Sequence, residues 1–218
     1  MFRHLLTAVV LVALFLPAMA LADQITQFSE VSGEPAFTIT DNVTFETLTA
    51  STSVYLTFDE NVIPFGRTPQ TATLTWSGTT SSYAHLAFGQ WIEEGFSGWF
   101  SIMAGTDNLF SGTFSNATLV ASGQTANFSE TDTPPVITYT SNYLNFSNAN
   151  VFALALSMTL SSSVSQDTNF RFLNFNHAAA TGTFWTDPPP TIVPEPVTLL
   201  LSGGALLGLG LLRRKRKS

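Results

Sequence analysis

The chain contains no cysteine. A protein without cysteine has no disulfide framework, no thiol nucleophile and no thiolate metal ligand. Its fold must therefore be stabilised by a hydrophobic core. A length of 218 residues is enough for one or two domains and for a core of that kind.

Lysine and arginine are almost missing from the middle of the chain. Between Asp23 and Val193 only Arg67 and Arg171 are basic, whereas fourteen residues are acidic, which gives this stretch a formal charge of −12. Such a stretch has no positive patch for nucleic acid or for an anionic membrane surface. We therefore expect no nucleic-acid partner, and we expect repulsion from acidic polysaccharide unless a divalent cation bridges the two.

The N-terminus has the layout of an export signal. A short basic segment precedes an apolar run from Leu5 to Leu16, and two overlapping small-x-small sites end at Ala20 and Ala22. The run is too short to span a membrane comfortably. Residues 1–22 are therefore predicted to be a signal peptide, removed by signal peptidase after Ala20 or Ala22.

The C-terminus combines an apolar segment with a basic end. Val197 to Leu212 carries no charge, and a helix of this length spans roughly 24 Å. Local thinning of the bilayer, and snorkelling of the flanking Arg and Lys side chains, can fit this helix to a hydrocarbon core of about 30 Å. The basic residues that follow are Arg213, Arg214, Lys215, Arg216 and Lys217. Since basic flanks stay in the cytoplasm, the sequence predicts a transmembrane helix that anchors the exported chain in the inner membrane.

The segment before this helix is rich in proline. In Pro194-Glu195-Pro196 the two prolines hold the glutamate extended and remove backbone donors, which suits an enzyme's active-site cleft. Pro188-Pro189-Pro190 adds a stiff spacer.

Together, Pro194-Glu195-Pro196, the apolar helix and the basic cluster resemble the PEP-CTERM sorting signal, over Val193 to Lys217 only. On this resemblance we refer to Pro194, Glu195 and Pro196 as the sorting tripeptide. This signal is the presumed substrate tag of exosortase, a transpeptidase-like membrane enzyme of Gram-negative bacteria that make exopolysaccharide. The resemblance implies that an exosortase-like enzyme processes the chain at the sorting tripeptide. It also implies a final place at the cell surface or outside the cell, in association with exopolysaccharide or biofilm.

Short alternating runs dominate residues 23–187. Thr and Ser alternate with large apolar residues in Val43–Thr49, Thr71–Trp76 and Val151–Leu160, and Gly, Pro, Asn and Asp clusters separate such runs. Period-two patterns of this kind indicate half-buried strands. We predict an all-β fold, an antiparallel, jelly-roll-like β-sandwich over residues 23–187. A Pro-rich linker and the sorting signal would occupy residues 188–218.

The residues that could carry catalysis form no strong motif. His85 and His177 belong to no zinc pattern, and Gly95 to Trp99 is one residue short of a nucleophile elbow. The chain is therefore not expected to be an enzyme.

Two pairs of adjacent carboxylates, Asp59 with Glu60 and Glu93 with Glu94, are interpreted as solvated loop charges. Neighbours on a strand would point to opposite faces, so neither pair supplies both an acid and a base. Glu93 and Glu94 do lie between Trp91 and Trp99, the composition of a sugar site. A glycan-active hydrolase therefore stays open.

Two other binding functions stay open. Oxygen-rich clusters at Asp59–Asn61 and Thr106–Asn108 could hold a structural calcium ion, although they lack the spacing of a known calcium loop. No other cofactor is expected. Thr-x-Thr repeats, which the sequence has at 38/40, 47/49, 71/73/75, 138/140 and 181/183, resemble the ice-facing surface of some ice-binding proteins. A carbohydrate-binding or ice-binding module would need an exposed aromatic strip or a flat Thr face. The function predicted first is a non-enzymatic surface or extracellular-matrix protein.

Overall fold

The computed structural model describes residues 23–31, 37–42, 44–59, 62, 70–132, 137–166, 173–175 and 178–193. The predicted signal peptide, the sorting tripeptide and the predicted transmembrane helix lie outside these residues. Within the described ranges, no helix is both long and apolar enough to cross a membrane.

All regular elements in the described ranges are strands, so the prediction of an all-β fold is confirmed. They are β1 (Asp23–Glu30), β2 (Thr38–Asp41), β3 (Glu46–Phe58), β4 (Gln70–Thr80), β5 (His85–Ala87), β6 (Gln90–Ala104), β7 (Asp107–Ser122) and β8 (Thr125–Asp132). The remaining strands are β9 (Thr138–Thr140), β10 (Leu144–Asn145), β11 (Val151–Leu160), β12 (Ser165–Gln166), β13 (Leu173–Asn174), β14 (Ala178–Asp187) and β15 (Thr191–Ile192).

The main sheet closes on itself. Its neighbours run β1–β3–β4–β6–β7–β8–β11–β14, and β14 pairs with β1, so eight antiparallel strands form a barrel. Each barrel strand pairs with the barrel strands next to it in the sequence, an up-and-down topology. Outside this circuit, β2 pairs with β3, β5 with β6 and β9 with β7.

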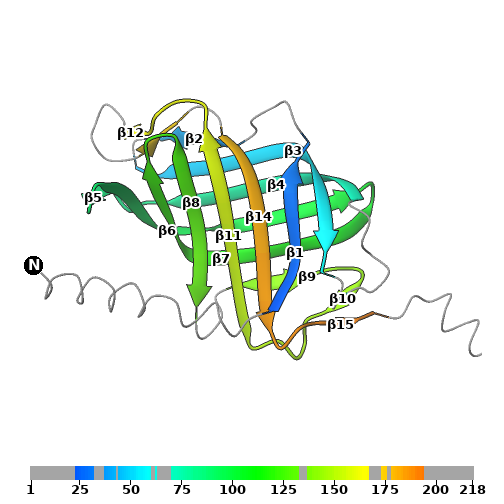
Figure 1. Ribbon diagram of the computed structural model, residues 1–218. Coiled ribbons are helices and arrows are strands. Elements are labelled where there is room, and N and C mark those ends of the chain that lie inside the picture. The colour runs from blue at the N-terminus through cyan, green and yellow to red at the C-terminus, as the bar shows by residue number, and fades with distance from the viewer. Residues whose placement is uncertain are drawn as a thin grey trace, which may run out of the picture.

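The predicted two-sheet, jelly-roll-like sandwich is therefore wrong in its details, although the antiparallel pairing is confirmed. Figure 1 shows two walls that cross: β1, β8, β11 and β14 stand upright in front of β3, β4, β6 and β7. The two walls form one continuous sheet because three long strands extend from one wall into the other. These strands are β3 with 13 residues, β6 with 15 and β7 with 16. A closed sheet exposes no free edge, which a sandwich would leave.

β6 and β7 bend where their pairing is irregular. The register shifts between Glu93 and Phe96 and again between Phe96 and Gly98. Gly95 on β6 and Asn116 on β7 have φ values of 78° and 68°, a region that glycine and asparagine tolerate. Bulges of this type increase the local twist and turn a strand from one wall into the next.

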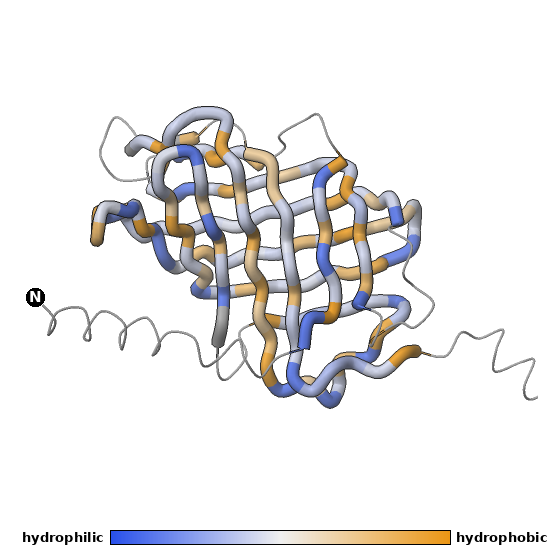
Figure 2. Tube along the Cα trace, in the orientation of Figure 1, coloured by the Kyte–Doolittle hydropathy of each residue, from blue (hydrophilic) through white to orange (hydrophobic). Residues whose placement is uncertain are grey.

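Alternation in the sequence explains which side of each strand is buried. In β4, Ala72, Leu74 and Trp76 are buried, while the residues between them face outward. Figure 2 shows the same alternation along the strands of both walls. Apolar residues at every second position thus line the inside of the barrel.

Aromatic rings fill the barrel. Trp76 stacks on Phe114 and Phe100 with ring centroids 4.9 and 5.5 Å apart, and Phe100 stacks on Phe184 of the opposite wall at 4.8 Å. Phe28 and Phe128 are also fully or almost fully buried. An eight-stranded barrel is just wide enough for side chains to fill, and here the rings link the two walls.

Candidate functional site

One block of outward residues on β2, β3, β4, β6, β7 and β9 makes a surface of almost uniform chemistry. Strand pairing places them in three neighbouring ranks that cross the strands. The ranks are Thr40–Thr47–Thr79–Ser97, Thr38–Thr49–Ser77–Trp99–Thr113–Thr138 and Ser51–Thr75–Ser101–Ser111–Thr140. We call this surface the hydroxyl face; every member except Trp99 is Ser or Thr. It lies on the outer side of the rear wall in Figure 1.

Several hydroxyl groups of the hydroxyl face are hydrogen-bonded across the strands. The distance between the two Oγ1 atoms is 3.1 Å for Thr38 and Thr49 and 2.7 Å for Thr113 and Thr138. Ser111 Oγ lies 2.8 Å from Thr140 Oγ1. Because each hydroxyl has one donor and two acceptor sites, these pairs fix side-chain orientation and keep further bonding capacity toward solvent.

Trp99 interrupts the hydroxyl face near its middle. Its side chain is 43% exposed, and its neighbours across the strands are Ser77 and Thr113. The preceding Gly98 lets the backbones approach closely, since a Cβ there would lie 1.9 Å from the Ser77 carbonyl oxygen. The result is a large ring surface surrounded by short polar side chains.

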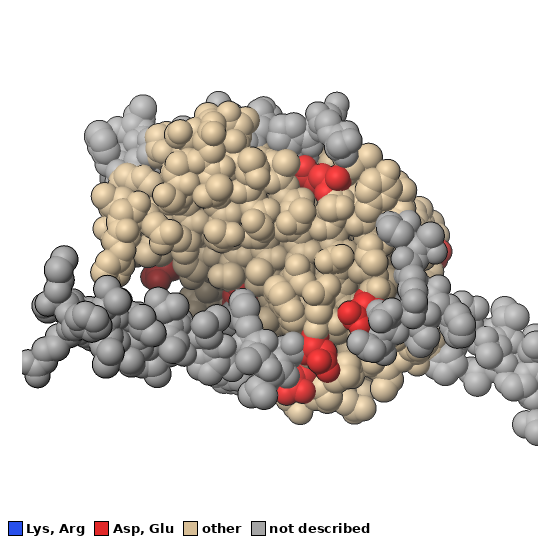
Figure 3. Space-filling view, in the orientation of Figure 1, with Lys and Arg blue, Asp and Glu red and all other residues tan. Residues whose placement is uncertain are grey.

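The hydroxyl face carries no charged residue. All eight Lys and Arg of the chain lie outside the described residues. Figure 3, which views the molecule from the side of the opposite wall, shows acidic groups in red and no blue ones among the described atoms. The hydroxyl face is thus a neutral area on an acidic protein.

The structure separates the carboxylates that might have formed an acid–base pair. Glu93 and Glu94 lie on β6 rather than in a loop, so their interpretation as solvated loop charges is wrong for Glu93. Glu93 is fully buried and its Oε2 accepts a hydrogen bond from the Leu173 N–H at 3.1 Å, whereas Glu94 is exposed. The two side chains point to opposite sides, as expected for strand neighbours.

The other candidates are scattered. His85 is exposed on β5, while His177 and Glu60 lie outside the described residues. Asp59 directly follows β3, and Asp107 and Asn108 begin β7. In the part of the chain that the structure describes, no three His, Cys, Asp or Glu side chains gather as a metal site would require.

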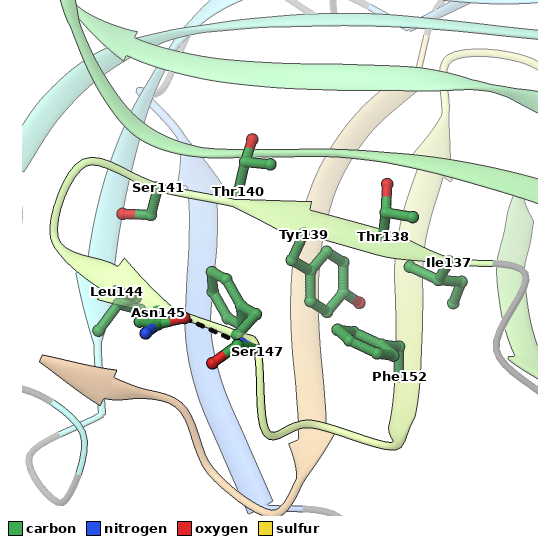
Figure 4. Close-up of a pocket in the computed structure, with 10 residues that line it drawn as sticks. Ile137, Thr138, Tyr139, Thr140, Ser141, Leu144, Asn145, Ser147 and Phe152 are labelled. Carbon is green, nitrogen blue, oxygen red and sulfur yellow. Dashed lines mark hydrogen bonds between the residues drawn. The ribbon is translucent and has the colours of Figure 1, made fainter. Parts of the chain in front are cut away.

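A separate pocket of about 480 Å³ lies beside β9 and the start of β11. Figure 4 shows Tyr139 and Phe152 pointing into it, while Thr138 and Thr140 point away, toward the hydroxyl face. The buried Tyr139 hydroxyl donates a hydrogen bond to the Ala153 carbonyl. Burial, and secondly the Glu130 charge, raise the pKa of Tyr139 well above its usual value, so the phenol stays protonated.

The segment before the sorting tripeptide is part of the folded unit. β15, within the stretch predicted as a Pro-rich linker, pairs with β10, and the Val193 N–H donates to the Tyr143 carbonyl at 2.8 Å. The ordered contacts therefore continue to the residue directly before Pro194.

Comparison with known proteins gives no relative. No family model, no curated protein and no solved structure matches this chain. The site must therefore be judged on its own geometry.

Sequence reasoning found seven threonines of the hydroxyl face, but not its serines or Thr79 and Thr113, and not the surface itself. The hydroxyl face includes the Thr-x-Thr repeats at 38/40, 47/49 and 138/140, and Thr75 from the repeat at 71/73/75. Thr181 and Thr183 lie on the opposite wall. The position of Trp99 among them depends on the pairing of β6 with β4 and β7. That pairing is a tertiary property without a local signal.

Proposed function

We propose that this chain is an exported, non-enzymatic protein of the cell surface or extracellular matrix, associated with exopolysaccharide. The observation that supports this most directly is the filled barrel beneath the neutral hydroxyl face. Rings such as Trp76, Phe100 and Phe184 occupy the space that a carrier would use for its ligand. A barrel built in this way acts through its outer surface.

Export and sorting would proceed in two steps. Signal peptidase removes residues 1–22, and the helix from Val197 to Leu212 then holds the chain at the inner membrane. An exosortase-like enzyme processes the chain at the sorting tripeptide and releases or transfers the barrel. Because Val193 is still bonded to Tyr143, the enzyme must reach a peptide that begins one residue beyond the folded domain.

The test replaces Pro194, Glu195 and Pro196 together by alanine and follows the size and cell fraction of the protein on a blot, with and without the enzyme. The variant should remain as an inserted, unprocessed precursor in the membrane fraction. Pro189→Ala, an exposed proline upstream, is the matched control and should be processed like the wild type. If the triple variant is trimmed and released like the wild type, the sorting tripeptide is not the processing site and acts only as a linker.

A second variant separates anchoring from processing. Deletion of Arg213 to Lys217 removes the charges that halt export. More of this chain should escape from the cell uncut, with the sorting tripeptide intact. Equal retention of this variant would contradict the role assigned to the basic cluster.

A further inference from the structure

We infer that the hydroxyl face binds a neutral polysaccharide, with Trp99 as the platform for one sugar ring. The inference rests on the proposed extracellular place of the protein, and it names the partner and the surface that the proposed function leaves open. It does not depend on how the tail is processed.

The first argument is hydrogen-bonding capacity. Sugar hydroxyls and Ser or Thr hydroxyls each donate one bond and accept two, so either partner can take either role. The paired hydroxyls of Thr113 with Thr138 and of Ser111 with Thr140 are already oriented before a ligand arrives. A ligand with hydroxyls along its whole length can therefore bond to several members of one rank, although each bond alone adds little.

The second argument is the ring of Trp99. One face of a sugar ring presents C–H groups, which are apolar and weakly positive, and the face of an indole is apolar and weakly negative. Trp99 offers such a surface because 43% of its side chain is exposed. Its neighbours Ser77 and Thr113 lie where they can bond the hydroxyls at the edge of a stacked ring.

The third argument is charge. Uronates and sulfated sugars need cationic partners, and the described residues include no Lys or Arg. The chain as a whole has a formal charge of −7, so an acidic polymer would be repelled. A neutral polymer has no such penalty on an uncharged surface.

The fourth argument separates a polymer from an ice surface. Adjacent strands of a sheet are rotated by about 20–25° relative to one another on average, and a closed sheet also curves, so the ranks across β3, β4, β6 and β7 do not lie in one plane. A planar lattice cannot contact all ranks of such a twisted wall. A polysaccharide can, because its glycosidic bonds let the chain follow the twist.

The test measures depletion of the purified full-length chain, in mild detergent, by insoluble cellulose, a β-1,3-glucan, agarose and calcium-free alginate beads. The wild type should bind at least one of the neutral polymers and not alginate. Trp99→Ala should weaken that binding about tenfold, the usual loss for a central aromatic contact. Trp185→Ala, on the outer side of β14, is the matched control and should bind like the wild type.

A double variant tests the hydroxyl groups without disturbing the fold. Thr113→Val with Thr138→Val removes both partners of one hydrogen bond and keeps their shape, which leaves stability nearly unchanged. It should weaken binding several-fold, and Thr181→Val with Thr183→Val on the opposite wall should not. Circular dichroism of each variant verifies folding.

Three results would overturn the inference: no binding to any neutral polymer, equal binding by the Trp99→Ala variant, or a preference for alginate. Ice-growth inhibition without glycan binding, or a dimer lost in Trp99→Ala on size exclusion, would assign the face to ice or to a second copy instead. Since the purified chain is assayed, a failure of tail processing cannot produce any of these results.

Discussion

The ring of Phe28 on β1 lies directly over the α-carbon of Gly182, its partner on β14. A Cβ built on Gly182 would be 2.1 Å from Phe28 Cε1 and 2.8 Å from Leu156 Cδ2. Glycine in a strand often marks such a close approach. This contact joins the first strand of the barrel to the last one and therefore lies at the seam that closes the sheet.

The Gly182→Ala variant should be strongly destabilised. Phe28 is almost fully buried and packs against Phe184, so it has little space to move, and overpacking of this kind costs about 1–3 kcal/mol or more. Urea unfolding should show the loss, while Thr181→Ala, one residue away and exposed, should change stability by less than about 0.5 kcal/mol. Phe28→Leu should recover part of the loss in the double variant. Purely additive losses would show that the contact does not limit packing.

The same seam explains which part of the fold the sequence could predict. Alternation in segments such as Thr71–Trp76 was sufficient to predict an all-β fold, because inward and outward positions differ at every residue. A sandwich and a barrel share that alternation, and they differ in whether β1 meets β14. The pairing of Phe28 with Gly182 joins positions far apart in the sequence, and no local pattern encodes it.

Individual polar residues were harder to place than whole strands. Glu93 lies in a run that reads as charged and solvated, yet the bulge near Gly95 directs it into the core. The register shift that decides this is a property of the β6–β7 pair. Conversely, the opposite orientation of Glu94 followed directly from strand geometry.

Removal of divalent metal should leave the thermal midpoint of the purified protein almost unchanged. Residues such as Leu74, Phe100 and Leu154 belong to one buried apolar core that spans both walls, and this core supplies the stability. The measurement is a thermal melt with and without EDTA, followed by far-UV circular dichroism. A large decrease with EDTA would instead make a calcium ion, at Asp59–Asn61 or Thr106–Asn108, part of the structure.

The exported form should begin at Leu21 or Asp23. β1 starts at Asp23, so cleavage after Ala20 or Ala22 removes the signal peptide and leaves every pair between β1 and its two neighbours intact. N-terminal sequencing of the protein recovered outside the cell checks this. A first residue beyond Asp23 would shorten the seam strand, and an N-terminal Met1 would remove the premise of cleaved export.

Glu30 should make the protein less stable as the pH rises from about 4.5 to about 7. Burial at the end of β1 raises the pKa of Glu30 from 4.5 to about 7, against the hydrogen bond from the Ala180 backbone, which lowers it. The folded chain therefore holds the Glu30 carboxyl proton more tightly than the unfolded chain does. Glu30 contributes most to the free energy of unfolding below pH 4.5, and this contribution declines as the pH rises to about 7.

The Glu30→Gln variant tests this dependence because glutamine keeps the shape and cannot ionise. Its stability relative to the wild type should increase between pH 4.5 and pH 7 and stay constant above that range, as measured by urea unfolding at each pH. Glu94→Gln removes one exposed carboxylate from β6 and should not reproduce the effect. A constant difference between Glu30→Gln and wild type from pH 4 to pH 8 would mean that solvent reaches Glu30 freely at the end of β1.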